Sequence, residues 1–309
     1  MKIVVMPGDG IGPEIVAATL KVLEVVDARL ALGLSFESHE VGFAALKGEG
    51  STFPARVLDR CRAAEAIILG PVSHSDYPPR AEGGVNPSGT LRIELDLYAN
   101  LRPSRSREGM RHWGRGPMDL VIVRENTEGF YADRNMHLGI GELMPTPDVA
   151  LAVRKITARA SERIARTAFR LAQSRRRKVT SVHKANVMRV TDGLFLRETR
   201  AVAAQFPDVA YEEQLVDSMA ALLVRDAARF DVVVTTNMFG DILSAAMLLD
   251  WLALRHGNEA FARARRLIES ALDTLLMDPR RHTADLGGTL GTRAFTEALC
   301  RQISGTNSF

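Results

Sequence analysis

The sequence contains few cysteines, no long hydrophobic run and no large excess of either charge. Its two cysteines, Cys61 and Cys300, stand in neither a C-x-x-C pair nor a zinc-binding spacing, so we expect buried thiols in a reducing compartment. The longest apolar stretch, 245–254, contains Asp250 and is too short to span a membrane. The apolar run at 3–7 is too short for a signal peptide. We therefore expect a soluble, cytoplasmic protein.

The charge balance argues against a nucleic-acid-binding protein. Forty Lys and Arg residues against 37 Asp and Glu residues give a net charge of +3, whereas nucleic-acid binders concentrate a larger basic excess. The one dense basic run is 175–178. We interpret it as a solvated helix end, because cations stabilise helix C-termini, with a phosphate-binding patch as the alternative. We expect no nucleic-acid partner and no membrane partner.

Apolar periodicity predicts alternating strands and helices along the 309 residues. Strands are predicted at 3–6, 66–69, 119–123, 179–182 and 231–235; helices are predicted from residue 13, over 147–173 and 191–206, and over 242–277 with a break near Gly257. Strands that alternate with helices predict an α/β protein with a largely parallel sheet. The irregular, Gly- and Pro-rich stretch 76–89 is typical of a functional loop.

A glycine-rich turn, 8–12, follows the first predicted strand. It fails the G-x-G-x-x-G spacing of a dinucleotide-binding loop, because Pro13 occupies the position of the last glycine. Taken alone, the segment favours a tight turn that leads into a helix, since proline is common at the first helical position.

Three arginines are candidates for anion binding. Arg124 directly follows the apolar run 120–123, so it should lie at the carboxyl end of a buried strand, where open α/β sheets bind ligands. Together with Arg92 and Arg102, it could bind the carboxylates of a di- or tricarboxylic acid through paired hydrogen bonds. The alternative is three independent surface or ion-paired arginines.

Two aspartates are candidate ligands of a hard divalent cation. Asp217 begins a predicted helix at 216–220, and Asp241 follows 236–240. Carboxylate oxygens are suitable ligands for Mg²⁺ or Mn²⁺. Capping of helix N-termini is the alternative role, and it is a common one for aspartate.

Several segments together resemble, in order, the signatures of the isocitrate/isopropylmalate dehydrogenase family of metal-dependent β-decarboxylating dehydrogenases. They are PGDGIGPE (7–14), LDLYANLRP (95–103), VRENTEG (123–129), HKANVM (183–188) and NMFGDILS (237–244), with TADLGG (283–288) resembling the C-terminal signature. The resemblance implies a two-domain α/β fold with a largely parallel sheet that is not a Rossmann fold. It also implies a discontinuous large domain, 1–98 plus 236–309, on the cofactor side and a small domain, 99–235, with the dimer arm and the substrate and metal residues.

The resemblance implies NAD-dependent oxidative decarboxylation of a 2-hydroxy di- or tricarboxylic acid. It assigns substrate binding to Asn86, Ser88, Arg92, Arg102 and Arg124, catalysis to Tyr131 and Lys184, Mg²⁺ or Mn²⁺ binding to Asp217 and Asp241, and NAD binding to Asp285. Lys184 would remove the proton of the 2-hydroxyl group, and Tyr131 would protonate the enol after CO₂ leaves. A metal ion polarises the hydroxyl and stabilises the enolate.

The resemblance also implies a homodimer with composite active sites. Lys184 and Asp217 would act in the site of the neighbouring subunit, and the stretch 131–145 would form an arm that crosses the dimer.

The chain departs from the family pattern after Asp241. The family carries a second aspartate four residues later, on the same helix face, where this chain has Ala245. Asp250 is nine residues past Asp241 and falls on another face. Several dozen residues that include the adenosine-binding loop are also missing after Ser244, as in an in-frame deletion. Whether this deletion is natural stays open, and so does the choice between NAD and NADP.

These departures leave two functions open. One is a dehydrogenase whose NAD binding and turnover are impaired; the other is an inactive relative that binds carboxylates or a partner subunit. For the first we expect an isocitrate-like or tartrate/malate-like substrate. The polar run 88–90 precedes Leu91-Arg92, where isopropylmalate enzymes carry leucines, and it offers hydrogen bonds to a polar substituent.

Overall fold

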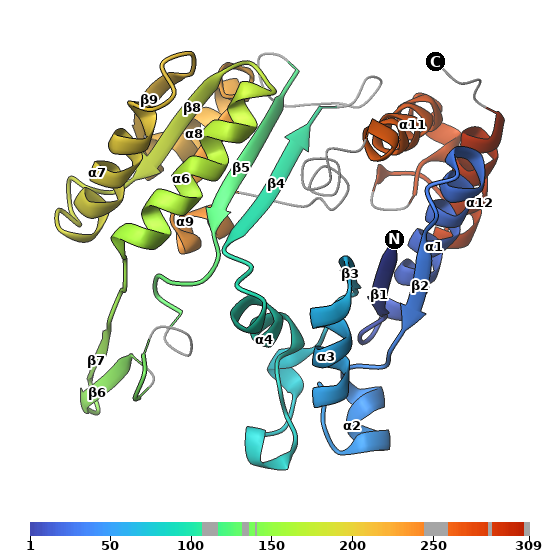
Figure 1. Cartoon of the computed structure of the whole chain (residues 1–309), viewed down its shortest axis with the longest axis horizontal. Coiled ribbons are helices and arrows are strands. Elements are labelled where there is room, and N and C mark those ends of the chain that lie inside the picture. Colours follow the sequence, from blue (N-terminus) through green and yellow to red (C-terminus); the bar gives the residue numbers. More distant parts are fainter. Residues whose placement is uncertain (107–116, 132–135, 140, 244–258, 284–285, 306–309) are drawn as a thin grey trace. The chain divides into compact units, whose positions relative to one another are not determined.

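The computed structural model describes residues 1–106, 117–131, 136–139, 141–243, 259–283 and 286–305 (Figure 1). The chain divides into two compact units, each taken here over its described residues. The first consists of Met1–Leu91 with Leu248–Phe309, and the second of Arg92–Arg107 with Arg111–Met247. Both ends of the chain therefore contribute to the first unit.

The first unit contains a three-stranded parallel sheet in the order β2-β1-β3, formed by β1 (Lys2–Met6), β2 (Ser35–Ser38) and β3 (Ala66–Leu69). The central strand β1 is almost wholly buried, as its apolar run predicts. The helices and 3-10 turns of this unit are α1 (Gly12–Leu30), α2 (Phe43–Glu49), α3 (Ala55–Ala63), η1 (His74–Asp76), η2 (Arg80–Glu82), α11 (Glu259–Leu276), η4 (Pro279–Arg281) and α12 (Thr292–Gly305). An apolar cluster that includes Val26, Leu275 and Ile303 joins α1, α11 and α12.

The second unit is built on a five-stranded sheet in the order β4-β5-β10-β8-β9. Its strands are β4 (Ala99–Arg105), β5 (Asp119–Glu125), β8 (Lys178–His183), β9 (Ala210–Leu215) and β10 (Val232–Thr235). All neighbouring strands are parallel except β4, which runs antiparallel to β5 at the edge. The sheet confirms the predicted α/β fold and its largely parallel pairing.

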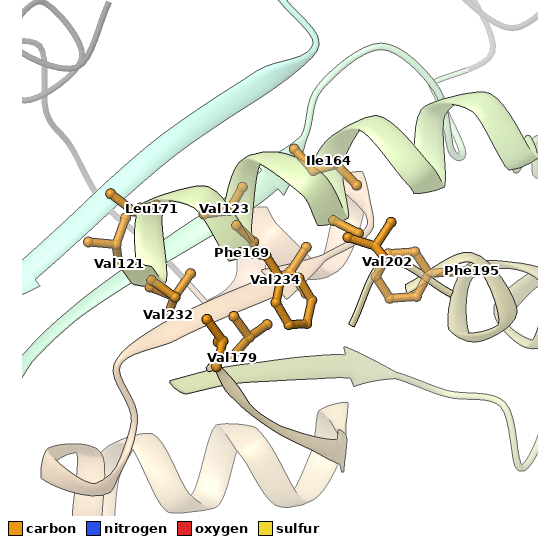
Figure 2. Packing of buried hydrophobic residues seen from close by; sticks show 14 of the residues in the cluster. Val121, Val123, Ile164, Phe169, Leu171, Val179, Phe195, Val202, Val232 and Val234 are labelled. Atoms are coloured by element: carbon orange, nitrogen blue, oxygen red, sulfur yellow. The ribbon is translucent and has the colours of Figure 1, made fainter. Parts of the chain in front are cut away.

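Helices cover both faces of this sheet because the strand residues alternate between two apolar clusters. Val121, Val179 and Val234 point toward the cluster that contains Phe169 of α6 (Ala158–Gln173) and Phe195 of α7 (Thr191–Ala203) (Figure 2). The intervening strand residues Leu120, Ile122, Val182 and Val233 pack with Met219 of α8 (Val216–Asp226) and Phe230, which follows η3 (Ala227–Arg229). Among the described residues, the remaining helices are α9 (Asn237–Ile242), in this unit, and α4 (Pro87–Glu94), which contains the division between the units.

The predicted helix over 147–173 is wrong in its first third. β6 (Glu142–Thr146) and β7 (Val149–Ala152) form an antiparallel hairpin there, and α6 begins only at Ala158. Thr157 caps the helix by accepting a hydrogen bond from the amide of Ala160. The apolar residues of 149–156 have a spacing that is also typical of a helix. Pairing with β6 nevertheless makes 149–152 a strand, and the Thr157 cap starts the helix at Ala158.

The basic run 175–178 follows the end of α6 and makes specific contacts. Arg175 donates to Asp119 and Asp231 at 2.8 Å each, and Lys178 lies 3.0 Å from Glu212. The Arg175 side chain is only 19% exposed, so the interpretation as a solvated helix end is wrong for Arg175. Its contacts neutralise the buried Asp231 at the start of β10.

Among the helices of the described residues, none combines the length and the apolar character needed to cross a bilayer.

Candidate functional site

Arg124 is the centre of a polar cluster at the carboxyl end of β5. Its side chain is 1% exposed and passes beside Gly240 of α9. The Nε atom donates to the backbone oxygen of Asn237 at 2.9 Å and to its Oδ1 atom at 3.0 Å. The Nη2 atom donates to the hydroxyl of Tyr131 at 3.1 Å and lies 2.5 Å from Oδ2 of Asp241. These contacts fix both the position and the direction of the guanidinium group.

Arg102 reaches the same cluster from the edge strand β4. Its Nη1 atom lies 3.2 Å from Oδ1 of Asp241 and donates to the backbone oxygen of Gly240 at 3.4 Å. The Tyr131 hydroxyl donates to Oδ2 of Asp241. The structure therefore brings together four of the predicted site residues, Arg102, Arg124, Tyr131 and Asp241. We call them the arginine cluster.

Asn237 supports the arginine cluster, although sequence reasoning assigned it no role. Its side chain is buried, accepts from Arg124 through Oδ1 and donates from Nδ2 to the backbone oxygen of Glu128 at 2.9 Å. It lies in the motif NMFGD, so its position was visible, but its partner is 113 residues away in the sequence. Only the fold reveals this pairing.

Lys184 and Asp217 form a second group. Lys184 follows β8, and Asp217 lies in the first turn of α8 after β9, so both are at carboxyl ends of parallel strands. The Nζ atom of Lys184 lies 2.6 Å from Oδ1 of Asp217. The hydrogen bond from Lys184 lowers the pKa of the Asp217 carboxyl, because it stabilises the charged form.

The three remaining substrate-binding candidates lie on or next to α4. Asn86 precedes the helix, and its Oδ1 atom accepts from the amide of Gly89 at 3.0 Å, as in a helix cap. Ser88 is half-buried in the first turn. Arg92 is half-buried in the last turn, and its backbone oxygen accepts from Leu97 at 3.0 Å.

The carboxylates fit a divalent cation only in part. Asp241 contacts the two arginines and Asp217 contacts Lys184, so they belong to different hydrogen-bonded groups. Within the described parts of the chain, no three His, Cys, Asp or Glu side chains converge as a metal-binding group. Ala245 and the proposed NAD-binding residue Asp285 lie outside the described residues.

The glycine-rich turn at 8–12 is held by its own aspartate. The carboxylate of Asp9 accepts from the amide of Phe43 at 2.8 Å, from the amide of Ser73 at 3.0 Å and from the Tyr77 hydroxyl. A side chain at Gly8, whose φ is +78°, would lie 2.2 Å from the backbone oxygen of residue 71. The glycine therefore permits a close approach of two backbones, which agrees with the interpretation as a tight turn.

Comparison with known proteins places these motifs in one family. Residues 2–250 match the family model described as isocitrate/isopropylmalate dehydrogenase. The chain belongs to this family. It is therefore a decarboxylating dehydrogenase by descent, in a family that typically uses NAD and a divalent metal ion.

Its relatives carry the names of more than one substrate. A 3-isopropylmalate dehydrogenase of Archaeoglobus fulgidus is 42% identical over 256 residues, covering 82% of this chain and 72% of the relative. An isocitrate/homoisocitrate dehydrogenase of Thermus thermophilus is 34% identical over 353 aligned positions, covering 98% of both chains. The crystal structure of isocitrate dehydrogenase from Methylococcus capsulatus matches with a TM-score of 0.82 and 33% identity, covering 98% of this chain and 99% of that one.

The alignment with the Thermus thermophilus enzyme bears on the expected deletion. It extends over 353 positions, whereas this chain has 309 residues, so the relative contains residues that this chain lacks. Their expected place, directly after Ser244, stays a prediction because that part of the chain lies outside the described residues.

Proposed function

We propose that this chain binds the carboxylates of a polar 2-hydroxy di- or tricarboxylic acid and catalyses its NAD-dependent oxidative decarboxylation. One observation carries the proposal: two guanidinium groups converge on a single carboxylate. Arg102 lies 3.2 Å from one oxygen of Asp241, and Arg124 lies 2.5 Å from the other. A substrate carboxylate in the same position would receive the same charge-assisted hydrogen bonds.

The environment of Arg124 favours anion binding. The guanidinium is charged at any physiological pH and is almost fully buried, so it needs an anion or several acceptors nearby. Asn237 and Tyr131 supply uncharged acceptors, whereas Asp241 supplies the charge and is itself 39% exposed. A substrate carboxylate could therefore replace Asp241 as the counter-ion while Asp241 turns toward a bound cation.

The remaining side chains suit the proton transfers of the reaction. The Tyr131 hydroxyl lies against both Arg124 and Asp241, so it is near the carbon that must be protonated if a substrate carboxylate is held by Arg124. Lys184 would remove the proton of the 2-hydroxyl group. Asp217 and Asp241 would hold Mg²⁺ or Mn²⁺, which would polarise the hydroxyl, and NAD would accept the hydride.

A homodimer would complete this site. The β6–β7 hairpin exposes apolar side chains, among them Leu143 (59%), Met144 (67%) and Leu151 (52%), and such a patch on a soluble protein is typical of an interaction surface. A second copy is the proposed occupant, because the family resemblance implies an arm at this place and because Lys184 and Asp217 form a group apart from the arginine cluster. In the dimer each such pair would act in the partner's site.

We further propose that turnover of this form is low because of weak NAD binding. Binding energy from the adenosine half positions the nicotinamide, and the residues expected to bind it are among those that we expect to be missing. The excess of aligned positions in the Thermus thermophilus relative supports this proposal. It also supports the second candidate, an inactive relative that retains carboxylate or partner binding.

A substrate panel tests the proposal. The chain is assayed for NADH formation and, by calorimetry, for binding of isocitrate, tartrate, malate and isopropylmalate, with Mn²⁺ present. We expect the polar acids to bind more tightly than isopropylmalate, since the segment 88–90 offers hydrogen bonds and no apolar surface. Tightest binding or fastest turnover of isopropylmalate would refute the proposed substrate class. Carboxylate binding without any turnover would favour the inactive relative.

A further inference from the structure

A buried ion pair outside the arginine cluster connects the segments that carry the proposed catalytic residues. Arg154 lies between β7 and α6 with its side chain 6% exposed, and Asp192 lies in the first turn of α7 with its side chain fully buried. The Arg154 Nη1 atom donates to Oδ1 of Asp192 and, at 2.9 Å, to the hydroxyl of Thr191. Neither Arg154 nor Asp192 has a role in the chemistry proposed above.

Asp192 holds the backbone of Lys184. Its second oxygen, Oδ2, accepts from the amide of Lys184 at 2.5 Å. The backbone oxygen of Lys184 accepts from Val187 and Met188 at 3.0 and 2.9 Å, and the amide of Asp192 donates to the oxygen of Met188 at 3.0 Å. The turn from Lys184 to Asp192 is therefore closed at both ends, and the carboxylate fixes the point from which the Lys184 side chain extends.

The other side of the Arg154 guanidinium holds α9 and the segment next to Tyr131. Its Nη2 atom donates to the hydroxyl of Thr236, the residue before α9, at 3.0 Å. The guanidinium carbon lies 5.4 Å from the ring centre of Phe239 in α9 and 5.6 Å from that of Phe130, which precedes Tyr131. Both distances are within the range of cation–π contacts.

We propose that Arg154 is a positioning residue that sets the Lys184 backbone, through Asp192, relative to the α9 helix that carries Asp241. This inference rests on the proposed function, in which Asp241 acts in this chain's own site and Lys184 acts in the site of the partner, so that Arg154 links one group of each site. Arg154 itself touches neither substrate nor metal ion. One guanidinium serves both sides because its donors point in several fixed directions, whereas a lysine ammonium has one compact head.

The chemistry of the pair supports positioning over simple stabilisation. Burying two charges costs solvation energy, and apolar residues of similar volume often stabilise a core as well or better. Directed hydrogen bonds from Arg154 to three side-chain oxygens instead define one arrangement of Lys184 and α9. Since small misplacements of catalytic groups slow reactions strongly, that arrangement matters for rate.

The test compares Arg154→Lys and Thr236→Val with the parent chain, and uses Arg166→Lys as the matched control. Arg166 is also on the second unit, but it pairs on the surface with Glu162 one helical turn away. Arg154→Lys keeps a positive charge near Asp192, but a single ammonium cannot make the directed hydrogen bonds to Thr191, Asp192 and Thr236 together, so both sides are loosened. Thr236→Val keeps the shape of the residue and removes only the hydroxyl that accepts from Arg154. Three quantities are measured: kcat, the Kd of isocitrate by calorimetry, and hydrogen exchange of the Lys184 amide by NMR.

We expect Arg154→Lys to lower kcat by about tenfold or more and to speed exchange of the Lys184 amide, with a small change in Tm. Thr236→Val should raise the Kd of isocitrate and leave exchange of the Lys184 amide unchanged, because it affects only the α9 side. Arg166→Lys should match the parent in all three. A role in stability alone would lower Tm while kcat, Kd and amide exchange of the folded protein stayed at parent values, and that result would overturn the inference.

The outcomes separate this inference from the proposed function. A parent chain that neither binds isocitrate nor forms NADH would refute the proposed function. The amide exchange of Lys184 then still decides the positioning claim: faster exchange in Arg154→Lys supports it, and unchanged exchange overturns it.

Discussion

Gly240→Ala perturbs the arginine cluster sharply without changing any charged side chain. A β-carbon at this position would lie 2.3 Å from Cγ of Arg124 and 2.6 Å from its Cβ atom, whereas ordinary contacts begin at 3.4 Å. The Arg124 side chain is 1% exposed and hydrogen-bonded to Asn237 and Tyr131, so it cannot swing away. Relief therefore requires a shift of about 1 Å between α9 and β5.

The magnitude follows from the contacts that such a shift would disturb. Overpacking of this kind costs about 1–3 kcal/mol of stability. Loss of one charge-assisted hydrogen bond to a bound carboxylate costs about 1.5–3 kcal/mol, which weakens binding about ten- to a hundredfold. A displacement near 1 Å also slows a positioned reaction on the order of a hundredfold.

The assay is calorimetric titration of isocitrate into the variant and the parent, with thermal unfolding of both. Gly193→Ala is the matched control, because Gly193 lies in α7 with no atom within 4 Å of the added β-carbon. The control should bind like the parent with equal or slightly higher stability. If Gly240→Ala bound isocitrate within about twofold of the parent, the reasoning about Arg124 would be refuted, since a factor of ten corresponds to about 1.4 kcal/mol.

Three further predictions concern the second unit. Arg124→Lys should weaken isocitrate binding by roughly tenfold or more, because an ammonium cannot reach Asn237 and a carboxylate together; calorimetry with an unchanged Kd would contradict this. Burial raises the pKa of Glu128 above its ordinary value of 4.5, so stability from the protonated form is complete below that value and is lost as pH rises through the raised pKa. Glu128→Gln can still accept from the amide of Thr157 and does not ionise. Its free energy of unfolding in urea, compared with that of the parent, should therefore increase as the pH rises from 4 to 8. A difference between the two that stays constant with pH would contradict this prediction. Leu143→Asp on the exposed hairpin should shift the mass from dimer toward monomer in light scattering, and an unchanged dimer mass would argue for another interface.

The fold was predictable where burial leaves a clear pattern. Strands that are buried on both faces are typically short runs of mostly apolar residues. Three such runs were predicted as strands, and the structure has a strand at each: Ile3–Met6, Ala66–Leu69 and Val232–Thr235. The edge strands β4 and β9 were missed because they lack that pattern. β4 contains two arginines and a proline, which an edge strand tolerates, and β9 is largely polar.

The candidate site was predictable as far as the motifs and the family resemblance extend. The motifs contain Arg102, Arg124 and Asp241, the resemblance adds Tyr131, and the structure brings these four together. The supporting residues were not predictable. Asn237 and Arg154 act through partners 113 and 82 residues away, and no local spacing encodes such contacts.

Titration of NAD into the chain, paired with a steady-state assay of NADH formation on isocitrate, tartrate and malate with Mn²⁺, separates carboxylate binding from cofactor binding. In the proposed function, the arginine cluster still binds carboxylates while weak NAD binding limits turnover. We expect calorimetry to detect isocitrate binding that Arg124→Lys weakens, together with weak NAD binding and slow NADH formation. Micromolar NAD affinity with turnover of several per second, which is ordinary for a working enzyme, would contradict it. It would show that residues outside the family's usual cofactor segment supply the NAD site.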